Sequence, residues 1–155
     1  MEYITPYGMT QIQKRIKVLA EERPSVMKAI GIAREMGDLS ENAEYKSARE
    51  RQRQIDNEVN YLKLRSSRIT VIDPATIPKD SVRFGAIIEG IELDINEPFC
   101  FQLVGVDEVN FIEDGAIKVS VASPIGKGFI GKKVGETTVI KVPKGDRLFK
   151  IESIR

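Results

Sequence analysis

The sequence predicts an α+β protein, with an N-terminal antiparallel α-helical coiled-coil hairpin and a C-terminal antiparallel β-sheet domain that includes a short helix. Three observations lead to this class. Apolar residues of the first half recur at alternating spacings of three and four, the segment GDLSEN interrupts that pattern once, and strand-length apolar runs follow Pro74. We expect the hairpin at residues 1–73 with its tip at 37–42, a linker at 74–80 and the sheet domain at 81–155.

Both arms of the expected hairpin carry the seam of a coiled coil. In the first arm the seam positions are Met9, Ile12, Ile16, Leu19, Arg23, Val26, Ile30 and Ala33. In the second arm they are Tyr45, Ala48, Gln52, Ile55, Val59, Leu62, Ser66 and Ile69. A break of roughly four to six residues suits a helix-to-helix connection, so the arms should pair as antiparallel neighbours within one chain. Pro24 removes a backbone donor from the first arm, and we expect a break or kink at residues 22–25.

The second half consists of short runs rich in β-branched and aromatic residues. The runs are VRFGAIIEGIEL, FCFQLVGV, AIKVSVA, TTVIKV and LFKIESI. Turn segments such as NEP, EDG and PKGD separate them, which is typical of an antiparallel sheet. SPIGKGFIGK is expected to form a short helix or a structured loop, and the two prolines of VIDPATIPKD mark the linker.

The composition excludes several classes of function. The 155 residues include 24 Lys and Arg and 23 Asp and Glu, so the net charge of +1 does not mark the whole chain as a nucleic-acid binder. The absence of histidine excludes Ser-His-Asp and Cys-His catalysis and histidine-ligated zinc. The single cysteine, Cys100, lies in the run FCF and is expected to be a buried, unreactive core residue. Since no signal segment and no bilayer-length apolar run is found, we expect a cytoplasmic protein.

Two acidic residues of the tip, Asp38 and Glu41, have two compatible interpretations. In the first, Gly37 ends one helix, Asp38 is the N-cap of the next and Glu41 completes a capping box. In the second, the two carboxylates bind Mg²⁺ at the exposed end of a helical rod. Because Mg²⁺ takes about six oxygen ligands, two carboxylates would only complete a metal site supplied by a partner.

Basic residues flank the tip on both sides. Lys46, Arg49 and Arg53 are spaced three and four apart and share one face of the second helix, while Arg34 precedes the tip. Each of them alone is explained as part of a solvated surface balanced by neighbouring glutamates. As a group beside an acidic tip, they are suited to contact nucleic-acid phosphates without reading sequence.

The segment GKGFIGKK, residues 126–133, matches the first seven positions of a phosphate-binding P-loop. Lys133 stands where a serine or threonine should meet Mg²⁺, and the preceding SPI does not supply the strand that leads into such a loop. We therefore expect no nucleotide site in this segment and interpret its glycines as turn residues.

The stretch AREMGDLSENAEYKSARERQ closely resembles the signature of the bacterial Gre transcript-cleavage factors, and SPIGKGFIGKKVGE resembles their C-terminal signature. The resemblance covers nearly the whole chain in the right order and spacing, and both signatures look more like the A type than the B type. It implies an N-terminal coiled-coil hairpin and a C-terminal domain with an FK506-binding-protein-like fold. The prediction from residue patterns agrees with this.

The resemblance also implies a function. In that family the hairpin enters the secondary channel of a backtracked RNA polymerase, and the tip acids help the polymerase to cleave its own transcript. Asp38 and Glu41 match the family's functional acids, which are thought to hold the second Mg²⁺ of the polymerase active site and to orient the attacking water. Such a factor has no cofactor of its own.

Further positions match the family outside the acidic tip. The resemblance implies packing roles and contacts with nascent RNA or polymerase for Arg34, Tyr45 and Arg49, beside Lys46 and Arg53 on the basic face. The region implied to touch the rim of the polymerase channel comprises Ser123, Pro124 and Ile125.

Three alternatives remain beside a cleavage-stimulating factor that binds RNA polymerase and the 3′ end of its nascent RNA. The first is a channel-binding inhibitor of the same architecture, against which the intact DLSE tip argues. The second is a prolyl isomerase, although fold alone does not confer that activity and the chain has no tryptophan and few aromatics. The third is a scaffold that dimerises through its helices, but the short connection favours pairing within a monomer.

Overall fold

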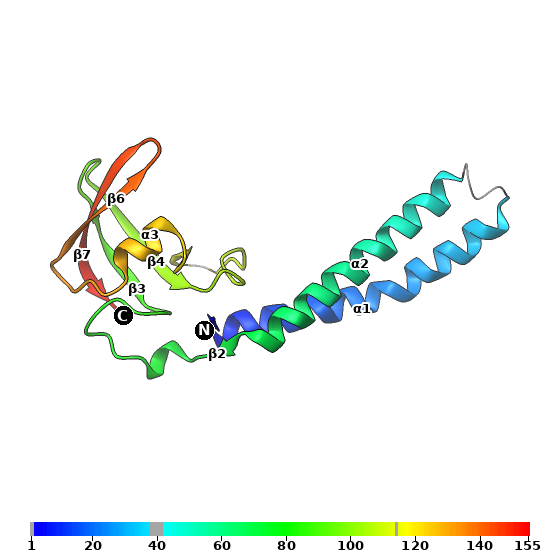
Figure 1. Cartoon of the computed structure of the whole chain (residues 1–155), viewed down its shortest axis with the longest axis horizontal. Coiled ribbons are helices and arrows are strands. Elements are labelled where there is room, and N and C mark those ends of the chain that lie inside the picture. Colours follow the sequence, from blue (N-terminus) through cyan, green and yellow to red (C-terminus); the bar gives the residue numbers. More distant parts are fainter. Residues whose placement is uncertain (1, 38–41, 114) are drawn as a thin grey trace. The chain divides into compact units, whose positions relative to one another are not determined.

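Two long helices form most of the first half of the chain in the computed structural model, which describes residues 2–37, 42–113 and 115–155 (Figure 1). Helix α1 spans Pro6–Glu35 and helix α2 spans Ala43–Arg68. The chain divides into two units. Thr10–Arg68 form the hairpin unit, and Met1–Met9 together with Ile69–Arg155 form the globular unit, so the first turn of α1 belongs to the latter.

The predicted seam forms the core of the hairpin unit. Leu19, Val26 and Ile30 of α1 pack with Ile55 of α2, and the residues packed around them are Tyr45, Ala48, Val59 and Leu62. Full burial of one such aliphatic side chain contributes about 1.5–3 kcal/mol. Helix α1 runs without interruption through Pro24, so the expected break at residues 22–25 is wrong, while the alternative of a kink stays a prediction. The antiparallel hairpin itself is confirmed.

Bidentate arginine–carboxylate pairs join the two arms beside this core. The pairs are Arg15–Glu58, Arg23–Asp56 and Arg51–Glu22. Arg23, the polar interruption of the first seam, thereby donates to Asp56 of the other arm at 2.9 Å. Each guanidinium lowers the pKa of its carboxyl partner, chiefly through the hydrogen bond between them.

The globular unit is built on a curled five-stranded sheet with strand order β5-β4-β3-β7-β6 (Figure 1). The strands are β3 (Ile87–Glu92), β4 (Glu97–Val104), β5 (Ile117–Ser120), β6 (Thr137–Val142) and β7 (Gly145–Ile154). Helix α3 spans Pro124–Phe129, and a 3-10 turn, η1, spans Pro74–Thr76. The α+β class is confirmed. The prediction that this sheet is antiparallel is wrong at β4 and β5, which pair in parallel because a long connection lets the chain return in the same direction.

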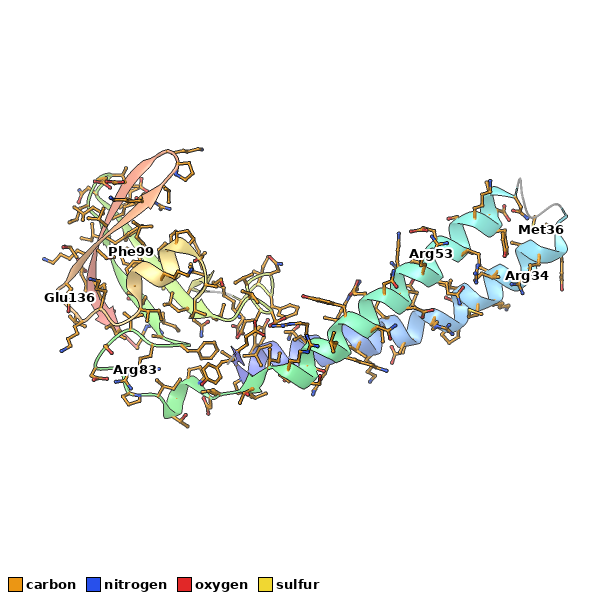
Figure 2. The ribbon with its side chains drawn as sticks, in the orientation of Figure 1. Arg34, Met36, Arg53, Arg83, Phe99 and Glu136 are labelled. Atoms are coloured by element: carbon orange, nitrogen blue, oxygen red, sulfur yellow. The ribbon has the colours of Figure 1, made fainter. Side chains whose placement is uncertain are left out.

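An aromatic cluster fills the core of this unit. Phe129 and Phe149 are fully buried and pack with Phe99 and Phe101 at ring-centroid distances of 5.0–6.1 Å. Figure 2 shows Phe99 among the strands of the sheet. The expectation that Cys100 is a buried core residue is wrong, because its side chain is half-buried and donates weakly to Glu89 of β3 at 3.9 Å. Desolvation still raises the pKa of the Cys100 thiol.

A short parallel pair brings the start of the chain beside the segment that follows α2. Strand β1 (Tyr3–Ile4) pairs with β2 (Thr70–Val71), and the backbone amide of Thr70 donates to the carbonyl of Glu2 at 2.9 Å. Ile4 is fully buried at this pair. Within the described ranges, no helix is both long and apolar enough to cross a membrane.

Candidate functional site

The first arm of the hairpin ends where the sequence predicts. Helix α1 stops at Glu35, and the amide of Met36 donates to the carbonyl of Ala33 at 3.1 Å. Gly37 follows with φ of +122°, a conformation that side chains with a Cβ rarely adopt. Gly37 therefore ends the arm, as its place before the acidic segment indicates.

The second arm begins with a cap that the sequence analysis did not assign. The side chain of Asn42 accepts a hydrogen bond from the amide of Tyr45 at 3.0 Å, which makes Asn42 the N-cap of α2. The predicted role of Asp38 as the N-cap of this helix is wrong. Asparagine succeeds here because it also carries donors: its Nδ2 donates to the carbonyl of Ala33 near the end of α1 at 2.8 Å. A carboxylate cannot make that second bond.

The two acids themselves, Asp38 and Glu41, lie outside the described residues. Their segment is bracketed by Gly37, with its positive φ, and by Asn42, with its bonds to Ala33 and Tyr45. Among the residues that the structure describes, no group of three or more acidic or cysteine side chains is arranged to hold a metal ion.

Arg34 and Tyr45 lie on facing arms near the end of the hairpin. The guanidinium carbon of Arg34 lies 5.9 Å from the centroid of the Tyr45 ring, at the limit of a cation–π contact. Tyr45 is half-buried against the hairpin core, whereas Arg34 is exposed. Figure 2 shows Arg34 and the exposed Met36 at the end of α1. Tyr45 therefore has a packing role whatever else it contacts.

The basic face predicted for α2 is exposed along its length. Arg49 donates to Gln52 at 2.7 Å, and Arg53 forms a surface ion pair with Glu50 at 2.5 Å. Figure 2 shows Arg53 on α2. Lys46 is exposed and makes no salt bridge to another described residue. Surface pairs of this kind contribute less than about 1 kcal/mol, so these side chains can exchange their local partners for phosphates.

Ser123, Pro124 and Ile125 form the start of α3 in the globular unit. Ser123 caps the helix, accepting from the amide of Gly126 at 3.0 Å, and Pro124 occupies the first helical position. Ile125 packs against the aromatic core, while Pro124 is exposed. The amide of Gly126 therefore binds within the helix cap. In a P-loop the backbone amides of such a segment would bind phosphate instead.

An apolar hollow of about 350 Å³ adjoins this segment within the globular unit. Its apolar lining comprises Tyr3, Phe84, Val106, Val121, Ala122 and Ile130. The rings of Tyr3 and Phe84 stand 5.7 Å apart at its wall. Sequence reasoning missed this hollow, because its lining comes from separate parts of the chain.

These features define a class of protein: a helical hairpin that presents an acidic connection between exposed basic arms, followed by a curled sheet unit. Two family models match it. The model described as transcription elongation factor, N-terminal, covers residues 2–71, and the model described as transcription elongation factor, GreA/GreB, C-terminal, covers residues 77–155. The chain belongs to the GreA/GreB family of transcription elongation factors.

Individual relatives agree with the family models. Transcription elongation factor GreA of Rhodospirillum rubrum is 42% identical over 98% of this chain and 96% of its own length. GreA of Thermodesulfovibrio yellowstonii is 42% identical over 97% of this chain and 94% of its own length. A solved structure of the transcription factor Gfh1 is 23% identical, with a TM-score of 0.46 over 100% of this chain and 98% of that one. The predicted A-type resemblance is confirmed by the curated relatives, and these matches lend no support to the alternative functions.

Proposed function

We propose that this chain binds RNA polymerase, inserts its hairpin into the secondary channel and stimulates the polymerase's own cleavage of the transcript in backtracked complexes, so that elongation resumes. The observation that carries the proposal is the cap of α2. Asn42 supplies the helix cap and the bond to Ala33, so neither Asp38 nor Glu41 is needed to start that helix. In a family of elongation factors, two acids that this cap does not require are candidates for chemistry.

The donor set of the tip suits a shared metal site. Asp38 and Glu41 offer carboxylate oxygens, the ligands that Mg²⁺ prefers, but two such groups fall short of its roughly six ligands. The polymerase active site would provide the rest. When bound there, a second Mg²⁺ would supply Lewis-acid stabilisation for cleavage of a phosphodiester. Asp38 and Glu41 would hold that ion and orient the attacking water, and the factor would perform no turnover alone.

The exposed bases give the hairpin a means to meet nucleic acid. Lys46, Arg49 and Arg53 line one face of α2, and Arg34 stands on the facing arm. We assign them to contacts with the nascent RNA near its 3′ end or with acidic polymerase groups. Tyr45 supports Arg34 through its ring and packs the end of the hairpin core.

The globular unit provides the contact with the rim of the polymerase channel. The exposed Pro124 beside the apolar hollow offers a surface for an apolar side chain of the partner, with Ser123 and Ile125 fixing its helix. Because the apolar seam of the hairpin is buried between its own arms, we propose that the factor acts as a monomer. It would work in the bacterial cytoplasm, where transcription takes place.

The experiment is a cleavage assay on a stalled, backtracked RNA polymerase complex that carries a 3′-labelled transcript. Short labelled fragments should appear rapidly only when factor, polymerase and Mg²⁺ are all present. Inhibition of nucleotide addition without cleavage would instead identify a channel blocker.

The basic face is tested by the Arg49→Gln variant, with Lys14→Gln as the matched loss of one exposed charge elsewhere on α1. The defect of Arg49→Gln should shrink as salt rises, because counterion release weakens phosphate contacts in wild type as well. A defect unchanged by salt would contradict phosphate contact.

A further inference from the structure

A buried carboxylate that the proposed function does not use lies in the globular unit. Glu108 is 0% exposed. Its Oε1 accepts from the backbone amide of Thr5 at 2.9 Å, and its Oε2 accepts from the hydroxyl of Thr5 at 2.6 Å. Thr5 immediately precedes α1 and accepts the amide of Gly8 at 3.1 Å with the same hydroxyl. Glu108 therefore binds the N-cap of α1 from 103 residues away.

This arrangement is a capping box completed by a distant residue. In the usual box, the N-cap side chain binds the amide of the third helical residue, whose own acidic side chain returns to the N-cap amide. Here the third helical residue is Gly8, which has no side chain, and Glu108 takes the place of the missing acid. A Cβ at Gly8 would lie 2.7 Å from Oε2 of Glu108. Because glycine has no Cβ, the carboxylate of Glu108 can occupy the space beside it.

A buried lysine holds the carboxylate in place. The side chain of Lys118 in β5 is 4% exposed, and its Nζ lies 3.9 Å from Oε2 of Glu108 and 2.7 Å from Glu113. The same Nζ lies 4.3 Å from the ring centroid of Tyr7, in the first turn of α1. Lys118 is paired in the sheet with Gln102 of β4. The first turn of α1 is thus tied through Glu108 and Lys118 to a hydrogen-bonded strand.

Stability alone is a poor reason for such a cluster. Burying a carboxylate and an ammonium group costs several kcal/mol in desolvation, and well-packed apolar residues often serve as well. Glycine near a helix start is also a weaker helix former than alanine. Both features are explained together if the cluster specifies where α1 begins.

We propose that Glu108 is a positioning residue. It completes the capping box of α1 and fixes the first turn of this helix, whose other end leads to the acidic tip. The consequence for activity rests on the proposed function. Without Glu108 the first turn of α1 loses its anchor and the tip acids reach the reacting phosphodiester less reproducibly. Polymerase contacts through the globular surface near Pro124 are unaffected.

The first test compares Glu108→Gln with Glu113→Gln in the full-length chain. Glutamine keeps the size of Glu108 but removes its charge and one acceptor, whereas Glu113 is the more exposed partner of Lys118 and does not touch Thr5. Amide hydrogen exchange at Thr5 and Gly8 should accelerate roughly tenfold in Glu108→Gln, given the usual strength of bonds to charged groups. It should remain near the wild-type rate in Glu113→Gln.

Stimulated transcript cleavage, titrated against factor concentration, gives a readout that a merely structural role would not produce. We expect Glu108→Gln to lower the rate at saturation several-fold while the half-saturating concentration changes less than about twofold. A loss that appears wholly as weaker binding would overturn the proposal. Unchanged exchange at Thr5 and Gly8 would overturn it as well.

Gly8→Ala tests the proposal through the direction in which it changes the rate of amide exchange. In an ordinary helix this change slows exchange of the first turn, because alanine is the better helix former. Here it should speed exchange, since the new Cβ would press on Glu108 and on Ile4, both at 2.7 Å. The effect should shrink when Glu108→Ala is combined with it, as coupled neighbours require. A stabilising Gly8→Ala would contradict the proposed geometry.

Two further controls separate the possible failures. If Glu108→Gln does not fold, Thr5→Ser and Thr5→Val replace it: the serine hydroxyl should retain slow exchange at Gly8, and valine should not. If the wild-type chain stimulates no cleavage at all, the proposed function fails, and amide exchange alone decides whether Glu108 anchors α1.

Discussion

The two helices of the hairpin begin in different ways. Helix α2 is capped by Asn42, a neutral residue adjacent to it, which also bonds to the facing arm. Helix α1 is capped by Thr5, which depends on a buried carboxylate 103 residues away. The start of α2 is thus held by bonds of Asn42 to nearby residues of the hairpin, and the start of α1 is held by a residue distant along the chain. Loss of the Glu108 contact at the start of α1 should therefore lower the free energy of unfolding more than loss of Asn42 at the start of α2.

The largest loss of stability should follow removal of the Glu108 carboxylate at the start of α1. Glu108→Ala leaves the amide and hydroxyl of Thr5 without their acceptor and Lys118 with Glu113 as its remaining carboxylate partner. Breaking a buried ion pair typically costs about 3–5 kcal/mol. Urea unfolding followed by circular dichroism measures this loss, and a cost below that of losing Asn42 would reverse the ranking.

Asn42, the N-cap of α2, should contribute less to the free energy of unfolding than Glu108. Asn42→Ala removes the acceptor for the Tyr45 amide and the donor to Ala33, and we expect a loss of about 1–2 kcal/mol. Asn42→Asp keeps the cap but cannot donate to Ala33, so its loss should be smaller. Thermal unfolding of the three proteins checks the order, and an aspartate variant as unstable as the alanine variant would contradict the second bond.

Low pH should weaken the arginine–carboxylate pairs that join the two arms of the hairpin. Glu22, Asp56 and Glu58 have pKa values lowered by their arginine partners in the folded state. Groups of this kind stabilise above their unfolded pKa values, near pH 4, and lose that contribution as pH falls through the lower folded values. Helix content measured from pH 5 to pH 2 should decline, and Glu22→Gln should make the decline shallower. An equally steep decline in that variant would exclude the Glu22–Arg51 pair as a cause.

The smallest effect on stability should come from the tip acids. Because Asn42 caps α2, Asp38→Ala and Glu41→Ala should change the melting temperature by less than about 2 °C, the effect expected of surface substitutions. The same melting experiment performed on Asn42→Ala provides the positive control. A large destabilisation by either acid variant would mean that capping is a principal role of that acid.

Local patterns in the sequence were sufficient for most of the fold. The three-four seam located Leu19, Ile30 and Ile55 in the hairpin core, since burial in a helix pair follows directly from that spacing. Gly37 likewise ended α1, because a positive φ is a local property. Pro24 does not break α1, since packing of the seam on both sides of it outweighs the loss of one backbone hydrogen bond.

The remaining features depend on contacts between distant residues. The cap of α2 was misassigned because Asp38 and Asn42 are both good N-cap residues, and only the carbonyl of Ala33 on the facing arm favours the amide. The role of Glu108 could not be predicted from the sequence, because nothing in its neighbourhood along the chain indicates Thr5. The family resemblance, by contrast, was readable from the sequence, since the DLSE tip and its flanks form one continuous segment.

The central claim is that the tip acids act in chemistry and not in folding. The most direct measurement is 3′-transcript cleavage by backtracked RNA polymerase at saturating wild-type, Asp38→Ala, Glu41→Ala and Asn42→Asp factor, with polymerase binding measured for each. We predict that both acid variants bind with near-wild-type affinity but cleave only at the polymerase's unstimulated rate, while Asn42→Asp retains stimulation. Full stimulation by either acid variant, or loss of binding together with cleavage, would contradict the account.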